Sequence, residues 1–247
     1  MTVHRTRVVS VEKCCEKVIR LELERPEGCV WKTGQFARIA LPEFVVDGEP
    51  VWRCYSIGSA GGSETLVFYI ALVKEGQLSP RLHALSVGDT VLLDDEMNGM
   101  LLEERLEAGG RDLWLFATGT GVASFLAVTQ DETIMSKYEH VVLVHGVSHW
   151  VETEYVTKFA VPHDNLSVVV CVTRDPGSLI QMRIPEALTS GKLEETTGLT
   201  IDPTVSRAMI CGNPAMAKAV RETLKTRGMV TPRGGKPGQL LVENFWL

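Results

Sequence analysis

The chain has 247 residues, of which 45% are hydrophobic and 23% charged, and its formal net charge is −6. This composition is typical of a globular protein with one large domain or two ordinary ones, and the negative charge does not favour nucleic acid or an anionic membrane as a partner. No apolar run approaches the roughly 18 residues of a membrane span, and the amino-terminal residues lack the apolar block of a signal peptide.

The first part of the chain, to about residue 105, has the pattern of short antiparallel strands. Ile19, Leu21 and Leu23 alternate with Arg20 and Glu22, and a period of two is typical of strands with one buried face. A short helix is expected near residues 79–85. Strands are expected at residues 8–11, 18–23, 36–41, 52–58, 66–73 and 91–93. The turns between them predict a sandwich or small barrel.

Residues 52–58 combine a cation, a ring and a hydroxyl in the sequence Trp-Arg-Cys-Tyr-Ser-Ile-Gly. In an extended strand Arg53 and Tyr55 point one way and Cys54 and Ser56 the other. These groups suit a planar ligand with a phosphate tail, whereas the plainer interpretation is a polar edge strand. Because Arg53, Tyr55 and Ser56 would all have to reach one ligand, we expect a bulge or kink within residues 55–58.

The composition changes at residues 103–111, which marks a candidate domain boundary. Beyond it, continuous apolar runs alternate with helical patterns, which predicts parallel strands covered on both faces in a doubly wound α/β sheet. The expected strands lie at residues 113–117, 141–144, 168–172, 208–211 and 240–242. Asn213 is expected to cap one helix, and Gly191 and Gly228 to end helices.

Two stretches of this second part could bind phosphate. Residues 117–125 follow a strand and open a helix with Gly119 and Gly121, which would let backbone approach a pyrophosphate, although the spacing is not GxGxxG and a tight turn is the simpler interpretation. Arg174 and Arg183 follow a later strand and could clamp a ribose 2′-phosphate, or they are two solvated surface arginines. Earlier in the chain, Ser79 is the expected N-cap of a helix whose first amides could hold a diphosphate.

Six cysteines are scattered along the chain: Cys14, Cys15, Cys29, Cys54, Cys171 and Cys211. No CxxC pair and no Cys/His ligand spacing is present, so we expect no zinc, iron–sulfur or other metal site. Cys171 and Cys211 stand in apolar runs and are expected to be buried free thiols. This usage is typical of the reducing cytoplasm.

Several motifs together resemble one family, the bacterial ferredoxin/flavodoxin–NADP reductases, over essentially the whole chain. They are Arg-Cys-Tyr-Ser, Gln-Leu-Ser-Pro-Arg-Leu, Gly-Thr-Gly-Val-Ala-Ser-Phe, Val-Thr-Arg, Cys-Gly-Asn-Pro-Ala-Met and Glu-Asn-Phe-Trp, in this order. The resemblance implies a six-stranded antiparallel β-barrel that binds FAD (residues 1–106) and a doubly wound parallel α/β domain that binds NADP (residues 107–247). It further implies a monomeric enzyme that passes a hydride between NADP(H) and FAD and single electrons to ferredoxin or flavodoxin. Alternatives are a flavin reductase that serves an oxygenase or cytochrome, and a non-catalytic nucleotide-binding module.

The resemblance also assigns roles to residues. The catalytic candidates are Ser56, Cys211, Glu243 and Trp246. The FAD contacts are Arg53, Cys54, Tyr55, Ser56, Tyr69, Ile70, Ala71, Leu72, Gln77, Leu78, Ser79, Thr120 and Trp246. The NADP contacts are Thr118, Gly119, Thr120, Gly121, Gly146, Val147, Arg174, Arg183, Cys211, Gly212, Asn213 and Met216. Trp246 is expected to cover the flavin and to move aside for nicotinamide.

Two features depart from the family pattern or add to it. Ser148 stands where bacterial relatives often carry an arginine that contacts the 2′-phosphate, which weakens the prediction of NADP over NAD. Leu247 follows Trp246 as the last residue, so the pose of Trp246 is open.

Basic residues late in the chain are a candidate docking surface for an acidic electron carrier, or simply a solvated helix face. They are Lys218, Arg221, Lys225, Arg227, Arg233 and Lys236.

Overall fold

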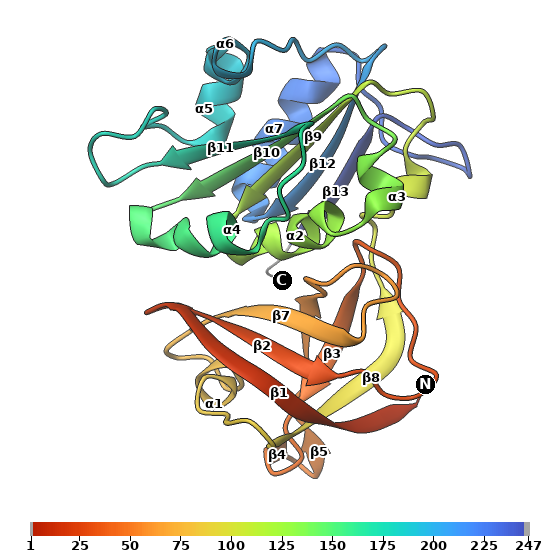
Figure 1. The fold of residues 1–247 in the computed structure, drawn as a ribbon, viewed down its shortest axis with the longest axis vertical. Coiled ribbons are helices and arrows are strands. Elements are labelled where there is room, and N and C mark those ends of the chain that lie inside the picture. Colours follow the sequence, from red (N-terminus) through yellow and green to blue (C-terminus); the bar gives the residue numbers. More distant parts are fainter. Residues whose placement is uncertain (1, 245–247) are drawn as a thin grey trace.

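The computed structural model describes residues 2–244, which form two halves that lie one above the other (Figure 1). The first half is a six-stranded sheet with the strand order β6-β3-β8-β1-β2-β7. Its strands are β1 (Val3–Cys15), β2 (Val18–Glu24), β3 (Phe36–Ala40), β6 (Arg53–Ser56), β7 (Thr65–Ala71) and β8 (Thr90–Asn98). A small hairpin, a helix and a 3-10 turn complete it: β4 (Val45–Val46), β5 (Glu49–Pro50), α1 (Ser79–Leu82) and η1 (Glu103–Arg105).

The two edge strands of this sheet meet and close it into a barrel. Ile57 pairs with Phe68 of β7, and the Gly58 amide donates to the Val67 carbonyl at 2.7 Å. A side chain at Gly58 could not be accommodated, because its Cβ would lie 2.8 Å from the Tyr69 ring. The prediction of an antiparallel six-stranded barrel is confirmed.

Strand β6 is more regular than expected. It pairs with β3 residue for residue, from Arg53 opposite Ile39 to Ser56 opposite Phe36, so β6 itself has no bulge, and the expected range of residues 55–58 extends beyond it. The irregularity comes one residue later, where the chain leaves β3 and Ile57 pairs with β7 instead. At this change of partner Ser56 is buried, while Arg53 remains exposed.

Helix α1 begins differently from the expectation. Leu78 is its N-cap and Ser79 its first residue, so the predicted capping role of Ser79 is wrong. The Ser79 hydroxyl instead accepts a hydrogen bond from the Val73 amide at 3.0 Å. It therefore closes the turn between β7 and α1.

The second half is a five-stranded parallel sheet with the order β11-β10-β9-β12-β13. Its strands are β9 (Asp112–Thr118), β10 (His140–Val147), β11 (Leu166–Val172), β12 (Ser206–Gly212) and β13 (Leu240–Asn244). On the face towards the barrel lie α2 (Ala123–Thr129), α3 (Glu132–Met135) and α4 (Glu154–Phe159), with the turns η2 (Gly119–Val122) and η3 (Trp150–Glu152) (Figure 1). On the other face lie α5 (Ile184–Thr189), α6 (Lys192–Thr197) and α7 (Pro214–Thr226).

The strand order reverses at β9, which has β10 on one side and β12 on the other. This is the doubly wound arrangement that the sequence predicts. Asn213 caps α7 as expected, accepting hydrogen bonds from the amides of Ala215 and Met216 at 2.9 and 3.3 Å. Strand β11 is an exception to the predicted burial: it lies at the sheet edge, and Val168 is 41% exposed. No helix among residues 2–244 is long and apolar enough to cross a membrane.

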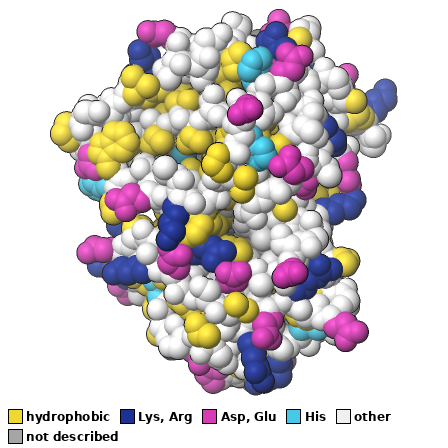
Figure 2. All heavy atoms as spheres, viewed as in Figure 1, with side chains coloured by type: hydrophobic (Ala, Val, Ile, Leu, Met, Phe, Trp, Pro, Cys, Tyr) yellow, Lys and Arg dark blue, Asp and Glu magenta, His cyan; other side chains and the backbone are white. Residues whose placement is uncertain are grey.

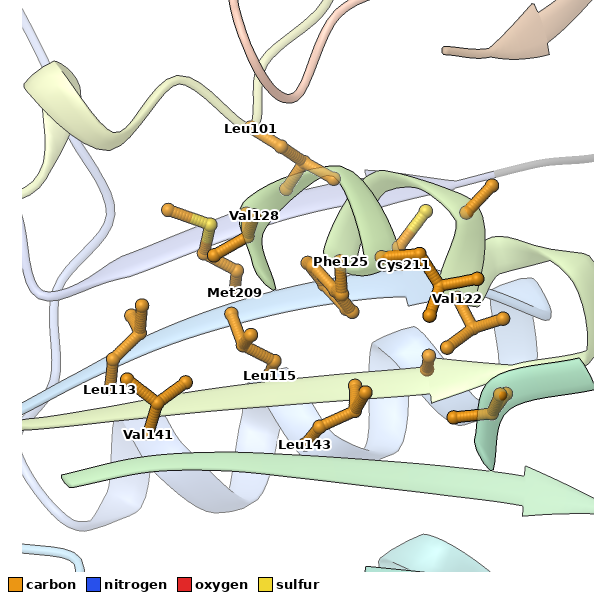
Figure 3. Packing of buried hydrophobic residues seen from close by; sticks show 14 of the residues in the cluster. Leu101, Leu113, Leu115, Val122, Phe125, Val128, Val141, Leu143, Met209 and Cys211 are labelled. Carbon is orange, nitrogen blue, oxygen red and sulfur yellow. The ribbon is translucent and has the colours of Figure 1, made fainter. Parts of the chain in front are cut away.

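One hydrophobic cluster spans the boundary between the halves. It joins Tyr69 of β7 and Leu101 of the connecting segment to Phe125 of α2 and to strands of the parallel sheet. Figure 3 shows Leu101 and Phe125 of this cluster above the strand residues. Hydrogen bonds reinforce this contact: the Gln130 side chain donates to the Gly58 carbonyl at 3.1 Å, and Thr33 donates to Asp131 at 2.6 Å. The halves therefore pack through a shared core.

We expect Phe125→Ala to lower the free energy of unfolding by about 3–5 kcal/mol, because it removes a fully buried ring from the shared cluster. Urea unfolding measures this change. Val168→Ala, on the exposed edge strand, is the control and should change it by roughly 0.5 kcal/mol or less. Equal effects of the two substitutions would contradict the assignment of the shared core.

Candidate functional site

A cleft of about 640 Å³ opens at the carboxyl ends of the parallel strands β9 to β12. Open α/β sheets bind their ligands at this edge, where the strand order reverses. Most of the NADP contacts expected from the sequence line the cleft: Thr118, Gly119, Gly146, Val147, Arg174, Arg183, Asn213 and Met216. The remaining ones, Thr120, Gly121, Cys211 and Gly212, are not among its lining residues.

The two arginines lie in the same cleft, at the ends of different elements. The Arg174 amide donates to the Ser148 carbonyl at 2.9 Å, which ties the turn after β11 to the turn after β10. Arg183 is the N-cap residue of α5, and its amide donates to the Glu186 carboxylate at 3.4 Å. Both side chains are exposed. Their guanidinium groups can therefore meet an anionic ligand together.

Glycines at the carboxyl ends of β9 and β12 serve two different purposes. A Cβ at Gly121 would lie 2.7 Å from the Cys211 carbonyl, and a Cβ at Gly212 would collide with the Thr118 hydroxyl. These two positions therefore let the turns after β9 and β12 pass each other, which the sequence interpretation did not foresee. Gly119, at φ +52°, has open space around its Cβ position and lines the cleft. Only Gly119 leaves room for a ligand to approach backbone.

Three of the catalytic candidates come together at the junction of the halves. Cys211 of β12 and Glu243 of β13 are register partners in the parallel ladder. Burial raises the pKa of the Cys211 thiol well above its usual value, Glu243 raises it further, and the hydroxyls of Ser124 and Ser56 oppose this effect. Ser56, at the end of β6 in the barrel, therefore lies beside residues of the second half. Trp246 lies outside the described residues.

Two buried oxygens at this junction make no hydrogen bond of normal geometry among residues 2–244, although one of them, the Ser56 Oγ, lies close enough to the Cys211 thiol to influence its pKa. They are the Ser56 Oγ and the Glu243 Oε1. Glu243 is only 8% exposed, its other oxygen accepts the Met100 amide at 2.8 Å, and burial raises its pKa to about 7. Buried polar groups are nearly always hydrogen-bonded, so this pair fits a site where a ligand with polar ring atoms lies between the halves.

Other residues expected to contact FAD extend from Ser56 along the barrel. The Arg53 guanidinium is exposed and donates to the Gln77 side chain at 3.4 Å, which brings two of them together. Tyr55 is half-buried, and burial raises the pKa of its hydroxyl to about 12. Cys54 is exposed. A cation, a ring and a hydroxyl thus follow one another towards the junction, as the sequence predicts.

The side chains of several other predicted FAD contacts point elsewhere. Tyr69 stacks on Tyr155 in the shared cluster, with 5.6 Å between ring centroids. Ile70 and Leu78 are buried in the barrel core, and the Ser79 hydroxyl is engaged in its turn. These four residues can contact a ligand only through backbone. The half-buried Ala71 and Leu72, and Thr120 after β9, keep partly open side chains.

The structure adds residues that the sequence interpretation missed. Glu152 and Glu186 line the cleft and offset the charge of the two arginines. The position of Glu186 could have been predicted from the sequence, because an acidic residue three positions after the N-cap is typical of a capping box. The contact of the Met100 amide with Glu243 could not have been predicted from a local sequence pattern, because 143 residues separate the two.

No protein-family model matches the chain. Over 98% of its length it is 37% identical to the ferredoxin–NADP reductase of Pseudomonas aeruginosa, 96% of which is covered. Over 97% of its length it is 31% identical to the flavodoxin/ferredoxin–NADP reductase of Escherichia coli, 97% of which is covered.

Solved structures give the same picture. At 32% identity, the chain matches a ferredoxin NADP+ reductase from Neisseria gonorrhoeae with bound FAD and NADP, with a TM-score of 0.91 and full coverage of both chains. A flavohemoglobin from Malassezia yamatoensis matches the whole chain over 61% of its own length, at 17% identity and a TM-score of 0.79. The second likeness concerns the fold alone.

Glu243→Gln should change how stability depends on pH in the ligand-free protein. Because burial raises the pKa of Glu243 from 4.5 to about 7, the folded state binds its proton more tightly than the unfolded state. This stabilisation is present below pH ~4.5 and is lost as pH rises through ~7, by up to about 3 kcal/mol. Urea unfolding at pH 5 and at pH 8 measures it.

Relative to the wild type, Glu243→Gln should lose less stability between these two pH values. Glu195→Gln, at a side chain that is 70% exposed on α6, is the matched control and should keep the wild-type difference. A Glu243→Gln variant with the wild-type difference would show that Glu243 is not the buried, proton-binding group of the junction.

Proposed function

This chain belongs to the ferredoxin/flavodoxin–NADP reductase family, and we propose that it transfers electrons between NADP(H) and ferredoxin or flavodoxin with FAD as its cofactor. One observation carries the proposal for this chain. Ser56 from the barrel lies beside Cys211 of the α/β half, whose register partner is Glu243, and this junction lies next to a cleft that contains Arg174 and Arg183. Such a site has a place for a redox cofactor between the halves and for an anionic nucleotide beside it.

Residues 1–106 are the proposed FAD-binding domain. The exposed guanidinium of Arg53 can pair with a phosphate, the ring of Tyr55 can pack on the flat ring system, and the unpartnered hydroxyl of Ser56 can hydrogen-bond to its edge. The unpartnered oxygens at the junction support the fit of these residues to the cofactor. When bound, FAD exchanges electron pairs with nicotinamide and single electrons with a carrier.

Residues 107–247 are the proposed NADP-binding domain. Arg174 and Arg183 are placed to pair with a 2′-phosphate, since guanidinium groups bind phosphate in a bidentate manner. The turn after β9, with Thr118 and Gly119, lines the same cleft and is proposed to hold the nicotinamide half. The Ser148 hydroxyl lies in this cleft too, and it can donate a hydrogen bond where an arginine would add a charge.

At the junction the chain's own residues would control protons and water. Glu243 has a pKa near neutrality, so its carboxyl can hold or release a proton at working pH. The fully buried Cys211 thiol stays protonated and fills space beside it. The apolar cluster behind them excludes water. Trp246, as the proposed cover of the flavin that gives way to nicotinamide, stays a prediction.

The partner and the setting are proposed at a coarser level. Ferredoxin or flavodoxin is the proposed carrier, the cytoplasm the proposed compartment, and a monomer the proposed state. The basic residues near the chain end divide between two places. Arg233 and Lys236 share a small pocket with Arg105, of about 270 Å³, whereas on α7 Arg221 pairs with Glu222. The docking surface for an acidic carrier stays a prediction.

The purified protein should be yellow from bound FAD, and NADPH should reduce both a dye and a ferredoxin through it. Arg183→Ala should raise the KM for NADPH by roughly tenfold, the cost of one charge-assisted contact, and should leave the KM for NADH nearly unchanged. Steady-state assays with both nucleotides measure this.

Lys192→Ala, at the start of α6, is the control: Lys192 does not line the cleft, and its substitution should leave both KM values unchanged. Equal losses with NADPH and NADH in Arg183→Ala would contradict a 2′-phosphate contact. A colourless protein without dye reduction would contradict the proposed function as a whole.

A further inference from the structure

Two buried side chains converge on one carbonyl of the turn after β9. The His145 Nε2 lies 3.0 Å from the Gly119 oxygen, and the Tyr155 hydroxyl lies 3.2 Å from the same atom. His145 comes from β10 and Tyr155 from α4. Their rings pack edge to face, with centroids 5.9 Å apart. The backbone of the proposed nicotinamide turn is therefore held by two side chains from outside it.

The protonation states of His145 and Tyr155 make both side chains hydrogen-bond donors to the Gly119 carbonyl. Burial lowers the pKa of His145 to about 4, so its imidazole is neutral, and a neutral ring that faces a carbonyl must carry its proton on that nitrogen. Burial also raises the pKa of the Tyr155 hydroxyl well above its usual value, so that hydroxyl keeps its proton. The His145 Nδ1 has no partner within residues 2–244. The site thus tolerates one unpaired nitrogen while Nε2 binds Gly119.

These contacts fix the orientation of one peptide group. A trans peptide is planar, so its C=O and N–H point in opposite directions. With the Gly119 carbonyl bound to the two rings, the Thr120 amide must point to the other side of the turn. Gly119 lies at φ +52° with open space at its Cβ position, and a glycine there could otherwise adopt several orientations. The pair of donors selects one of them.

Tyr155 also connects this turn to the barrel. Its ring stacks on Tyr69 of β7 at 5.6 Å with an interplanar angle of 27°. The rest of α4 is held by the barrel as well: Lys158 pairs with Glu12 of β1, and the Arg20 guanidinium lies 5.0 Å from the Phe159 ring centroid. In Figure 2, charged side chains of both signs and hydrophobic atoms meet along this boundary. Tyr155 therefore contacts the barrel with its ring and the nucleotide turn with its hydroxyl.

We propose that Tyr155 is a positioning residue for hydride transfer. By contacting both the barrel and the Gly119 carbonyl, it fixes the position of the Gly119 turn relative to the barrel. This inference rests on the proposed function, because it takes the turn to hold nicotinamide and the barrel to hold FAD. Nothing in it requires contact of Tyr155 with either ligand. A turn that is free to shift would misplace the nicotinamide, and small misplacements reduce rate strongly. The remote 2′-phosphate end, at Arg174 and Arg183, would be unaffected.

Tyr155→Phe tests the proposal, because it removes the hydroxyl and retains the ring that stacks on Tyr69. In the FAD-loaded protein, we expect the rate of flavin reduction by NADPH, measured by anaerobic stopped-flow absorbance, to fall about fivefold to tenfold, the equivalent of one hydrogen bond. FAD content and the affinity for 2′-phospho-AMP should stay at wild-type values, and the melting temperature should fall by no more than the few degrees expected for one hydrogen bond. A purely structural tyrosine would not produce this split between rate and affinity.

Tyr138→Phe is the matched control. Tyr138 belongs to the same buried cluster, and its hydroxyl donates to Glu103 at 3.1 Å, away from the turn. Its removal should leave the reduction rate unchanged. The proposal is overturned if Tyr155→Phe reduces flavin at the wild-type rate, if Tyr138→Phe slows it equally, or if Tyr155→Phe loses FAD or its fold. A wild-type protein whose flavin NADPH does not reduce would instead refute the proposed function.

Discussion

The apolar contact between the barrel and the parallel sheet is the constraint on which the rest of the structure depends. The shared cluster, with Tyr69 and Phe125 at its centre, holds the end of β6 against the ends of β12 and β13. Without it Ser56 and Glu243 would belong to separate bodies, and neither half contains a complete site. Burial of large side chains across a boundary is also what makes two halves move as one. The arrangement of the proposed site is therefore a product of packing.

The same packing has an electrostatic cost at the junction. Glu243 is buried with a single amide partner, and Ser56 with none among residues 2–244. Buried groups without partners destabilise a fold, and functional sites are where such costs are commonly retained. A cofactor that supplies hydrogen bonds to both oxygens would remove the cost on binding. His145 is a parallel case, since one ring nitrogen goes unpaired while the other holds Gly119.

Much of this architecture could be predicted from the sequence, because periodicity reports burial directly. The alternation around Ile19 to Leu23 and the apolar runs such as residues 113–117 correspond to β2 and β9. The residue type alone predicted the N-cap correctly at Asn213 but not at Ser79. The Ser79 hydroxyl instead accepts a hydrogen bond from the preceding turn. Contacts between distant segments, such as Met100 with Glu243 and Tyr155 with Gly119, leave no local pattern. They depend on how the two halves pack.

The proposed function requires a flavin between the barrel and the α/β half, bounded by Ser56 and Glu243. The most direct test is a crystal structure of the FAD-loaded protein. We expect the flavin ring at this junction, with Ser56 Oγ within hydrogen-bonding distance of it and the Arg53 guanidinium on the phosphates. A ring bound elsewhere, with both buried oxygens still unpartnered, would contradict it.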